Sequence, residues 1–340
     1  MPTHRLQNGT SHGVRLSLNP IRLASAADLA RIVDPARRRE EEETLLNAVA
    51  SNLVSLAGAG GELDAQRTFL YLLLEAMPRG RNVQLSDVVA AIMSPDSIGV
   101  DQPDLIVRKS DREKLGRKLN SFVMGPAKNL FSGGFPLDVD ELIRPSAQGK
   151  IPLNVIYLNA LIDDEQKHFF LAALAAEIYR WMVTSLDATA GRPHLLFYLD
   201  EARDFIPAGG RKPPAKDPLI RLFTQGRKYG VGCLLCTQSP RSVDYNVFGN
   251  CSTKIVGRME AAQDVERIAD WFTLTGPSPG WVAERKGAPK GTFVGRWPGI
   301  AAADEGKVFK GRVLYSAHEG AWSPDRVEQE VNASRTRRQT

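Results

Sequence analysis

The chain has 340 residues, of which 43% are hydrophobic and 24% charged, so it can bury a sizeable core and is not disordered as a whole. Its net charge of +5 (44 Lys and Arg minus 39 Asp and Glu) is compatible with a polyanionic partner and is too small to indicate one alone. Three cysteines, no apolar run of about 18 residues and no visible signal peptide argue against a disulfide framework, a membrane span and secretion, so we expect a cytoplasmic protein.

The amino-terminal part of the chain is predicted to be mostly helical. Residues 14–18 alternate like a short strand, and residues 25–30 resemble a capped helix start. The block 35–93 has helical periodicity, with a Gly-rich stretch at 58–61 that lacks the Lys-Ser/Thr of a phosphate-binding loop and follows a helix rather than a strand. Residues 94–150 give a weaker signal, within which 111–124 predicts an amphipathic helix.

The second half of the chain alternates apolar strands with helices. Apolar runs at 153–158, 194–199 and 231–236 predict strands, and the segments between them predict helices. The runs at 194–199 and 231–236 are continuous, which suits strands buried on both faces of a parallel sheet. Strand and helix in this order predict an α/β fold with a doubly wound, mainly parallel sheet.

Polar residues follow two of these strands directly. Asp200 and Glu201 end the first, and Gln238 follows the second, so an amide is expected close to two carboxylates at the sheet edge where ligands bind. Phosphoryl transfer to water needs a carboxylate near Mg²⁺, a group that orients or deprotonates the water, and a cation. Asp200 suits the first role and Glu201 the second, Gln238 suits a γ-phosphate sensor, and Arg227 suits a cation presented to a neighbouring subunit.

Each of these residues also has a simpler interpretation. An apolar strand followed by Asp200 and Glu201 is equally typical of a helix N-cap with an acidic first turn. Arg227 follows a predicted helix that begins at Asp217 and Pro218, where a cation neutralises the helix dipole. The two interpretations differ in whether the side chains meet at one place.

Three segments in this order and spacing resemble the ATPase core of the HerA/FtsK superfamily of ring-shaped DNA translocases, and they are most similar to HerA-type helicases. The segments are LLFYLDEARDFIP, LIRLFTQGRKYGVGCLLCTQSPRSVD and FGNCSTKIVGRM. The resemblance implies a RecA-like P-loop NTPase core that uses ATP and Mg²⁺, with Walker B at Asp200 and Glu201, Mg²⁺ at Asp200, an arginine finger acting in trans at Arg227, and a sensor at Gln238. It also implies DNA as a partner and a homo-oligomeric ring, a hexamer by family pattern, which works with a nuclease or a P-loop-bearing chain.

The sequence departs from that family at the phosphate-binding loop. No Gly-x-x-x-x-Gly-Lys-Ser/Thr occurs, and neither Gly149-Lys150 nor Gly306-Lys307 is followed by Ser or Thr. The backbone cradle and lysine that hold nucleotide phosphates are therefore missing. We expect the chain to be the carboxyl-terminal part of an ATPase domain from a truncated or split gene, or to receive its P-loop from another polypeptide, and to be inactive alone.

The expected organisation follows from the resemblance. Residues 1–34 form a lead-in and partial ATPase core, 35–150 a mostly helical insertion, 151–275 the RecA-like core with Walker B, 276–330 short strands that complete the domain, and 331–340 a basic tail. The expected function is an ATP-dependent DNA translocase or helicase. The alternatives are a conjugation or secretion motor ATPase, and a non-catalytic DNA-binding or assembly subunit.

A Pro- and Gly-rich loop between the two motif strands is basic. Arg211, Lys212 and Lys216 are candidates for contact with DNA phosphates in a ring channel, and an ordinary solvated loop is the alternative.

Two further motifs are expected to be structural. Cys233 and Cys236 have CxxC spacing but lie on an apolar strand, so we expect buried core residues on opposite faces. His168 has no partner at metal-ligand spacing and is expected to be a packed or exposed histidine.

Overall fold

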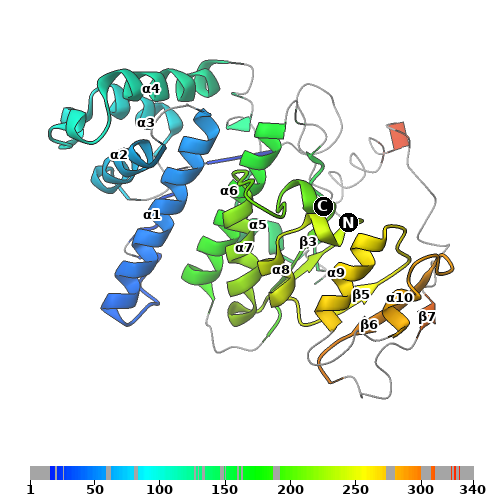
Figure 1. Cartoon of the computed structure of the whole chain (residues 1–340). Coiled ribbons are helices and arrows are strands. Elements are labelled where there is room, and N and C mark those ends of the chain that lie inside the picture. Colours follow the sequence, from blue (N-terminus) through cyan, green and yellow to red (C-terminus); the bar gives the residue numbers. More distant parts are fainter. Residues whose placement is uncertain are drawn as a thin grey trace.

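The structure is a computed structural model. It describes residues 16–19, 21–25, 27–58, 63–79, 83–125, 128, 130–131, 135–145, 149, 151–158, 161, 164–186, 192–272, 280–299, 308–310, 323, 325–326 and 329. In Figure 1 the helices from the first part of the chain form one block, α6 and α7 lie beside it, and the labelled strands β3, β5, β6 and β7 lie on the far side of these two helices.

The described helices and strands follow in chain order. The α-helices are α1 Pro35–Ala57, α2 Leu63–Ala76, α3 Leu85–Met93, α4 Lys109–Met124, α5 Val139–Ile143, α6 Asp164–Ser185, α7 Lys216–Gln225, α8 Tyr245–Asn250, α9 Ala262–Phe272 and α10 Gly280–Ala283. Short 3₁₀ turns are η1 Pro95–Ile98, η2 Pro103–Leu105, η5 Ala202–Asp204, η6 Gly226–Tyr229 and η7 Pro240–Ser242. The strands are β1 Leu16–Ser17, β2 Phe135–Pro136, β3 Leu195–Leu199, β4 Val231–Leu235, β5 Lys254–Val256, β6 Thr292–Arg296 and β7 Phe309–Lys310.

Helices α1 to α4 form the helical block, and the sequence predicts them well. The Asp34 side chain accepts a hydrogen bond from the Ala36 amide at 3.1 Å, which caps α1, and Gly58 ends it in the left-handed conformation at φ 52°. In α4 the apolar stripe of the predicted amphipathic helix is Leu115, Leu119 and Phe122, of which the two leucines are fully buried and Phe122 is half-buried. The helix predicted at 25–30 is instead a turn, in which Ser25 and Asp28 exchange side-chain and backbone hydrogen bonds.

Helix α6 joins the helical block to the strands. It contacts α1 on one side and α7 on the other, and most of its residues are buried. Its polar groups are paired: Tyr179 Oη donates to Glu41 of α1 at 3.0 Å, and Trp181 Nε1 donates to Asp140 of α5 at 2.7 Å. These bonds fix α6 against both neighbours and leave no buried donor unsatisfied at these two positions.

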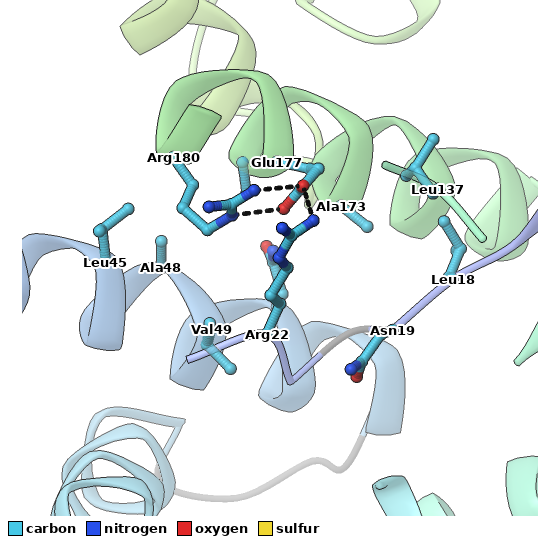
Figure 2. Close-up of a pocket in the computed structure, with 12 residues that line it drawn as sticks. Leu18, Asn19, Arg22, Leu45, Ala48, Val49, Leu137, Ala173, Glu177 and Arg180 are labelled. Atoms are coloured by element: carbon cyan, nitrogen blue, oxygen red, sulfur yellow. Dashed lines mark hydrogen bonds and ion pairs between the residues drawn. The ribbon is translucent and has the colours of Figure 1, made fainter. Parts of the chain in front are cut away.

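A buried ion network anchors the segment before α1 to α6 (Figure 2). Glu177 accepts bonds from Arg180 at 2.7 and 2.8 Å and lies 2.5 Å from Arg22, which also lies 3.4 Å from Asp138. All four side chains are nearly inaccessible to solvent. Removing one member of such a network leaves an uncompensated buried charge, so the network makes this junction sensitive to substitution.

The predicted parallel sheet is present in part. β3 and β4 pair in parallel from Leu195 opposite Val231 to Leu199 opposite Leu235, as expected for the two motif strands. β1 and β2 form a second short parallel pair, whereas β5, β6 and β7 form an antiparallel sheet. Within the described residues these are small separate sheets rather than one doubly wound sheet.

The prediction that β3 and β4 are buried on both faces is wrong for the described part of the chain. Burial alternates along β3, where Phe197 is buried, Leu196 is 71% exposed and Tyr198 is 53% exposed. The buried face packs on α7, with the Phe197 ring 6.4 Å from that of Phe223. Helices therefore cover one face of the pair, and no described element covers the other.

The apolar run at 153–158 is not a strand. Residues 151–157 have no regular secondary structure and belong to no β-ladder among the described residues. The segment is held to α5 by a bond from Asn154 Nδ2 to the Leu142 carbonyl at 2.8 Å, while Leu153 and Val155 are exposed. An apolar run becomes a strand only where a neighbouring strand can bond its backbone.

The carboxyl-terminal elements have a small core of their own. Val256 of β5, Ile268 of α9, Val282 of α10 and Val294 of β6 pack together. The sequence has a strand-like run at 253–256 and a helical pattern at 261–272, and these segments are β5 and α9 in the structure. The predicted basic tail 331–340 lies outside the described residues. Across the described part of the chain, every helix is too short or too polar to cross a bilayer.

Candidate functional site

The carboxyl ends of β3 and β4 lie side by side because their hydrogen bonding continues past the strands. The Cys236 amide donates to the Leu199 carbonyl at 2.9 Å, and the Ala202 amide donates to the Cys236 carbonyl at 3.1 Å. The residues that follow both strands are therefore held at one edge of the sheet.

Glu201 and Gln238 meet at this edge. Glu201 has φ 48° and ψ 47°, a left-handed conformation that is uncommon for a residue other than glycine and costs on the order of 1–3 kcal/mol. Its carboxylate accepts a hydrogen bond from Gln238 Nε2. The expected contact between the first strand's carboxylates and the second strand's amide is confirmed for this pair.

The helix-cap interpretation of Asp200 and Glu201 is not supported. The turn that follows is the short η5, and Glu201 stands at its N-cap position without a capping hydrogen bond from its side chain. The Asp200 carboxylate accepts a bond from the Glu201 amide at 3.0 Å and remains exposed. Asp200 is therefore exposed and Glu201 half-buried, and neither carboxylate caps a helix.

Tyr198 belongs to the same edge and was missed in the sequence. Its side chain shares a face of the strand with Asp200, and both Asp200 and Cys236 act on the pKa of its hydroxyl. Burial, together with the charges of Cys236 and Asp200, raises the pKa of Tyr198 to about 12. Strand alternation could have predicted this position, because residues 198 and 200 lie on the same face of a strand. At neutral pH Tyr198 is a neutral hydroxyl beside the Asp200 carboxylate.

Arg227 lies at the opposite end of β4. It is exposed on η6, which precedes β4, whereas Gln238 follows β4. A strand rises about 3.3 Å per residue, so the five residues of β4 alone separate the two ends by about 17 Å. Arg227 is therefore not brought together with Glu201 of the same chain. Arg227 follows α7 directly and is exposed. Both interpretations therefore remain open: a cation presented to a neighbouring subunit, and a cation that neutralises the dipole of α7.

The structure corrects the role expected for Lys216. Its side chain is 6% exposed, and the ammonium lies 2.8 Å from the Asp244 carboxylate and donates to the Pro207 and Gly209 carbonyls at 2.7 and 3.3 Å. Burial acts to raise the pKa of Asp244, but the bonds from Lys216 and the Asn246 amide outweigh it, so the pKa lies below its usual value. Lys216 fastens the 207–211 loop and is not free to contact DNA.

The other two basic residues of the loop are exposed. Arg211 and Lys212 face solvent, so their contact with DNA phosphates stays a prediction. The helix after the loop begins at Lys216 with Ala215 as N-cap, two residues before the position expected from Asp217 and Pro218.

The histidine and cysteines have structural environments. His168 is buried edge-on against the Phe205 ring at 5.2 Å, and burial followed by the Arg211 charge lowers its pKa, as expected for a packed histidine. Cys233 lies on the α7 side, where burial raises its pKa to about 12, whereas Cys236 is exposed. The opposite directions of the two cysteines are confirmed, and the burial expected for Cys236 is wrong.

The site has the groups for half of a magnesium–nucleotide site. Mg²⁺ usually binds through one or two carboxylates together with substrate phosphates and water, and Asp200 and Glu201 provide the carboxylates. Within the described residues no cluster of three or more His, Cys, Asp or Glu forms a complete metal site. The backbone cradle and lysine that hold phosphates do not occur in the sequence. The arrangement fits Mg²⁺ only where a phosphate is supplied from elsewhere.

Comparisons with known proteins gave limited similarity. No family model matches the chain. A probable helicase of Methanocaldococcus jannaschii is 32% identical over 73 residues, which are 22% of this chain and 14% of that protein, so the chain spans about a seventh of this curated relative. Among solved structures, the genome packaging NTPase B204 of Sulfolobus turreted icosahedral virus 2 in complex with ATP-gammaS has a TM-score of 0.33 at 16% identity, covering 48% of this chain and 69% of that one. The DNA-packaging ATPase B204 of Sulfolobus turreted icosahedral virus has a TM-score of 0.33 at 12% identity, covering 47% of this chain and 67% of that one.

Proposed function

We propose that this chain is the water-activating half of an ATP-dependent DNA translocase or helicase of the HerA type. The observation that carries the proposal is the hydrogen bond between Glu201 and Gln238 at the shared carboxyl edge of two parallel strands. This is the edge where ligands bind in open α/β sheets. Partial sequence similarity to a probable helicase agrees with the proposal.

Each residue at the edge has a defined task in this proposal. Asp200 would hold Mg²⁺, which would supply positive charge to the phosphates. Glu201 orients the attacking water and accepts its proton. Gln238 holds the Glu201 carboxylate through its amide and senses the γ-phosphate.

Arg227 acts in trans in this proposal. The length of β4 separates it from Glu201 of its own chain, and its side chain is exposed. A ring of subunits, expected to be a hexamer, would place Arg227 of one subunit at the nucleotide of the next. An arginine in this role stabilises the charge that develops on the transferred phosphoryl group.

A second candidate function is a non-catalytic DNA-binding or assembly subunit. The observation that favours it is the absence of Gly-x-x-x-x-Gly-Lys-Ser/Thr from all 340 residues. The retained pairing of Glu201 with Gln238 disfavours it, because a subunit without chemistry has no need of a strained carboxylate held by an amide.

The test is ATP hydrolysis by a form of the chain that is joined to, or reconstituted with, a P-loop-bearing polypeptide. We expect Mg²⁺-dependent hydrolysis that duplex DNA stimulates. DNA binding without any hydrolysis would support the non-catalytic subunit instead. Hydrolysis that a protein substrate stimulates and DNA does not would support a secretion motor.

A further inference from the structure

The turn that carries Arg227 is closely packed. η6 directs Tyr229 inward, where it is 5% exposed, and leaves Arg227 exposed. A glycine begins this turn and another follows it. A Cβ on Gly226 would lie 2.9 Å from a carbonyl oxygen of β4, and a Cβ on Gly230, whose φ is 70°, would collide with the Arg192 carbonyl. The backbone of the turn is therefore closely confined, and its place decides where the Arg227 guanidinium lies.

Tyr229 connects this turn to the helical block. Arg37 of α1 donates a hydrogen bond from Nη2 to the Tyr229 hydroxyl oxygen at 3.1 Å. The two residues are 192 positions apart in the chain, so the bond joins the first helix of the block directly to η6. The position of α1 and the position of the turn are thus linked through one buried side chain.

A second contact of α1 supports the helix that precedes the turn. Glu41 lies four residues after Arg37 and therefore on the same face of α1. It accepts a hydrogen bond from Tyr179 of α6 at 3.0 Å, and the Arg221 guanidinium of α7 lies over the Tyr179 ring, 5.5 Å from its centre. α7 runs directly into η6. α1 therefore reaches η6 by two routes, directly through Tyr229 and indirectly through Tyr179 and α7.

Both tyrosines are buried, and their hydroxyls bond to α1. Burial, followed by the Glu41 charge, raises the pKa of Tyr179, so its hydroxyl stays protonated and donates. A shift of α1 would separate the hydroxyls from Arg37 and Glu41, and an unpaired buried polar group is costly. In Figure 1 α1 lies along α6, which also contacts η6. We therefore expect α1, α6 and η6 to move together.

We propose that Arg37 and Glu41 are positioning residues for Arg227. They hold η6 in place through Tyr229 and Tyr179, so the position of the helical block sets the position of the Arg227 guanidinium. The inference rests on the proposed function for what Arg227 does once it is placed. A displacement of about 1 Å can lower a reaction rate by about 10²-fold. Because Arg227 is proposed to act on charge that develops during the reaction, its displacement should lower kcat and leave ATP binding unchanged.

The first experiment measures the turn in the full chain without nucleotide. The Gly230 amide donates to the Arg227 carbonyl at 3.2 Å, so its hydrogen exchange reports opening of the turn. Tyr229→Phe keeps the buried ring and removes the hydroxyl, and Arg37→Met removes the donor. Each should speed exchange of the Gly230 amide by about 5-fold, as expected for loss of one hydrogen bond. The double variant should match the single variants, because both remove the same bond.

Matched controls lie in the helical block away from the turn. Arg39→Met removes a neighbouring arginine of α1 whose side chain is 84% exposed. Tyr71→Phe removes the hydroxyl of a half-buried tyrosine on α2. Both variants should leave exchange of the Gly230 amide within about twofold of the unmodified chain, as expected for substitutions away from the contact.

The second experiment measures ATP hydrolysis by the form of the chain that carries a P-loop. Tyr229→Phe and Glu41→Ala should each lower kcat by about 10-fold and leave the KM for ATP within about twofold. Glu41→Gln should restore most of the rate, because its amide oxygen still accepts a bond from Tyr179. In an Arg227→Ala background Tyr229→Phe and Glu41→Ala should have no further effect, because the group that they position is already absent.

Two results would overturn the inference. Unchanged exchange of the Gly230 amide in both Tyr229→Phe and Arg37→Met would show that α1 does not hold the turn. An equal loss of kcat with and without Arg227 would show that the contacts of α1 act on the fold of the subunit and not through Arg227.

Failure of the inference and failure of the proposed function are distinguishable. The hydrogen exchange measurement needs neither ATP nor a P-loop. Faster exchange of the Gly230 amide, together with full hydrolysis by Arg227→Ala, would uphold the contact of α1 with η6 and contradict the role proposed for Arg227. Unchanged exchange, together with loss of hydrolysis in Arg227→Ala, would uphold the arginine finger and contradict the inference.

Discussion

The helical block and the strand region differ in how completely they bury their apolar residues. In α1 to α4 the inward residues, such as Leu53, Phe69 and Leu115, are fully buried against other helices of the same block. In β3 and β4 every second residue is exposed although it is apolar. The helical block buries its inward apolar residues, while the strand region, among the described residues, presents an open edge and an uncovered face.

The proposed chemistry lies in the strand region, where apolar residues are left exposed. Asp200, Glu201 and Gln238 lie at the end of the strands whose other face is open. A site at such an edge is completed by whatever covers the sheet. In the proposed function the helical block has a structural role, and the strand region acts on a nucleotide whose phosphates a P-loop-bearing polypeptide holds.

The largest effect is expected at Arg227, on the strand side. In a complex that carries a P-loop, Arg227→Ala should lower ATP turnover by about 10³-fold or more, because an arginine finger contributes on this scale. Steady-state hydrolysis measures it, and an unchanged melting temperature shows that the subunit still folds. Lys228→Ala, the adjacent exposed cation, is the matched control and should retain most of the activity.

Mixing decides whether Arg227 acts across a subunit boundary. Subunits with Arg227→Ala and subunits with Glu201→Gln should regain partial activity in mixed rings, because some interfaces then join an intact Arg227 to an intact Glu201. No recovery despite proven mixing would indicate that Arg227 serves only the end of α7.

The next effect is expected on the helical side and is one of stability. Glu177→Ala should lower the free energy of unfolding by about 3 kcal/mol or more, because it leaves two arginines in a buried place without their shared carboxylate. Denaturant unfolding measures the change. The control is Glu141→Ala, which removes a solvent-exposed pair with Arg144 and should cost less than about 1 kcal/mol. Equal losses for both variants would contradict the importance of the buried network.

Substitution of Glu201 separates the two regions further, because in the strand region it should change ATP hydrolysis and not the stability of the fold. In a P-loop-carrying complex, Glu201→Gln should leave ATP binding nearly intact and lower hydrolysis by about 10²-fold or more, as expected for loss of a general base. Asp204→Asn, an exposed carboxylate three residues away, is the control. Hydrolysis of Glu201→Gln within a few-fold of the unmodified protein would show that Glu201 is not the base.

The smallest effect is expected for the basic loop. Combined Arg211→Ala and Lys212→Ala should weaken DNA binding and reduce the slope of log affinity against log salt by about 1 to 2, because each phosphate contact releases close to one counterion. Arg108→Ala, together with Lys109→Ala at the start of α4, is a control pair of exposed cations in the helical block. Equal slopes for both pairs would mean that the 207–212 loop is an ordinary solvated loop.

Local signals were sufficient to predict much of the fold. Helical periodicity predicted α1 and α4, because each buries a stripe against other helices, and most residues of the predicted helix α6 are buried between α1 and α7. The two motif strands and the contact between Glu201 and Gln238 followed from parallel strands whose carboxyl ends share an edge.

The remaining features depend on contacts that a local pattern does not contain. An apolar run such as 194–199 is compatible with one covered face or two, and only the surrounding elements decide between them. Lys216 looked like a surface cation, since its partner Asp244 lies 28 residues further along the chain (244 − 216). The apolar run 153–158 pairs with no strand among the described residues, and residues 151–157 have no regular secondary structure.

The most direct test of the half-site is titration of the purified chain with a fluorescent ATP analogue and Mg²⁺. The account predicts no saturable binding at micromolar concentrations and no hydrolysis, because Asp200 and Glu201 repel the phosphates without a cradle to neutralise them. Micromolar binding by the chain alone, with hydrolysis that is lost in Asp200→Ala, would contradict this account, since it would reveal a complete phosphate site within these 340 residues.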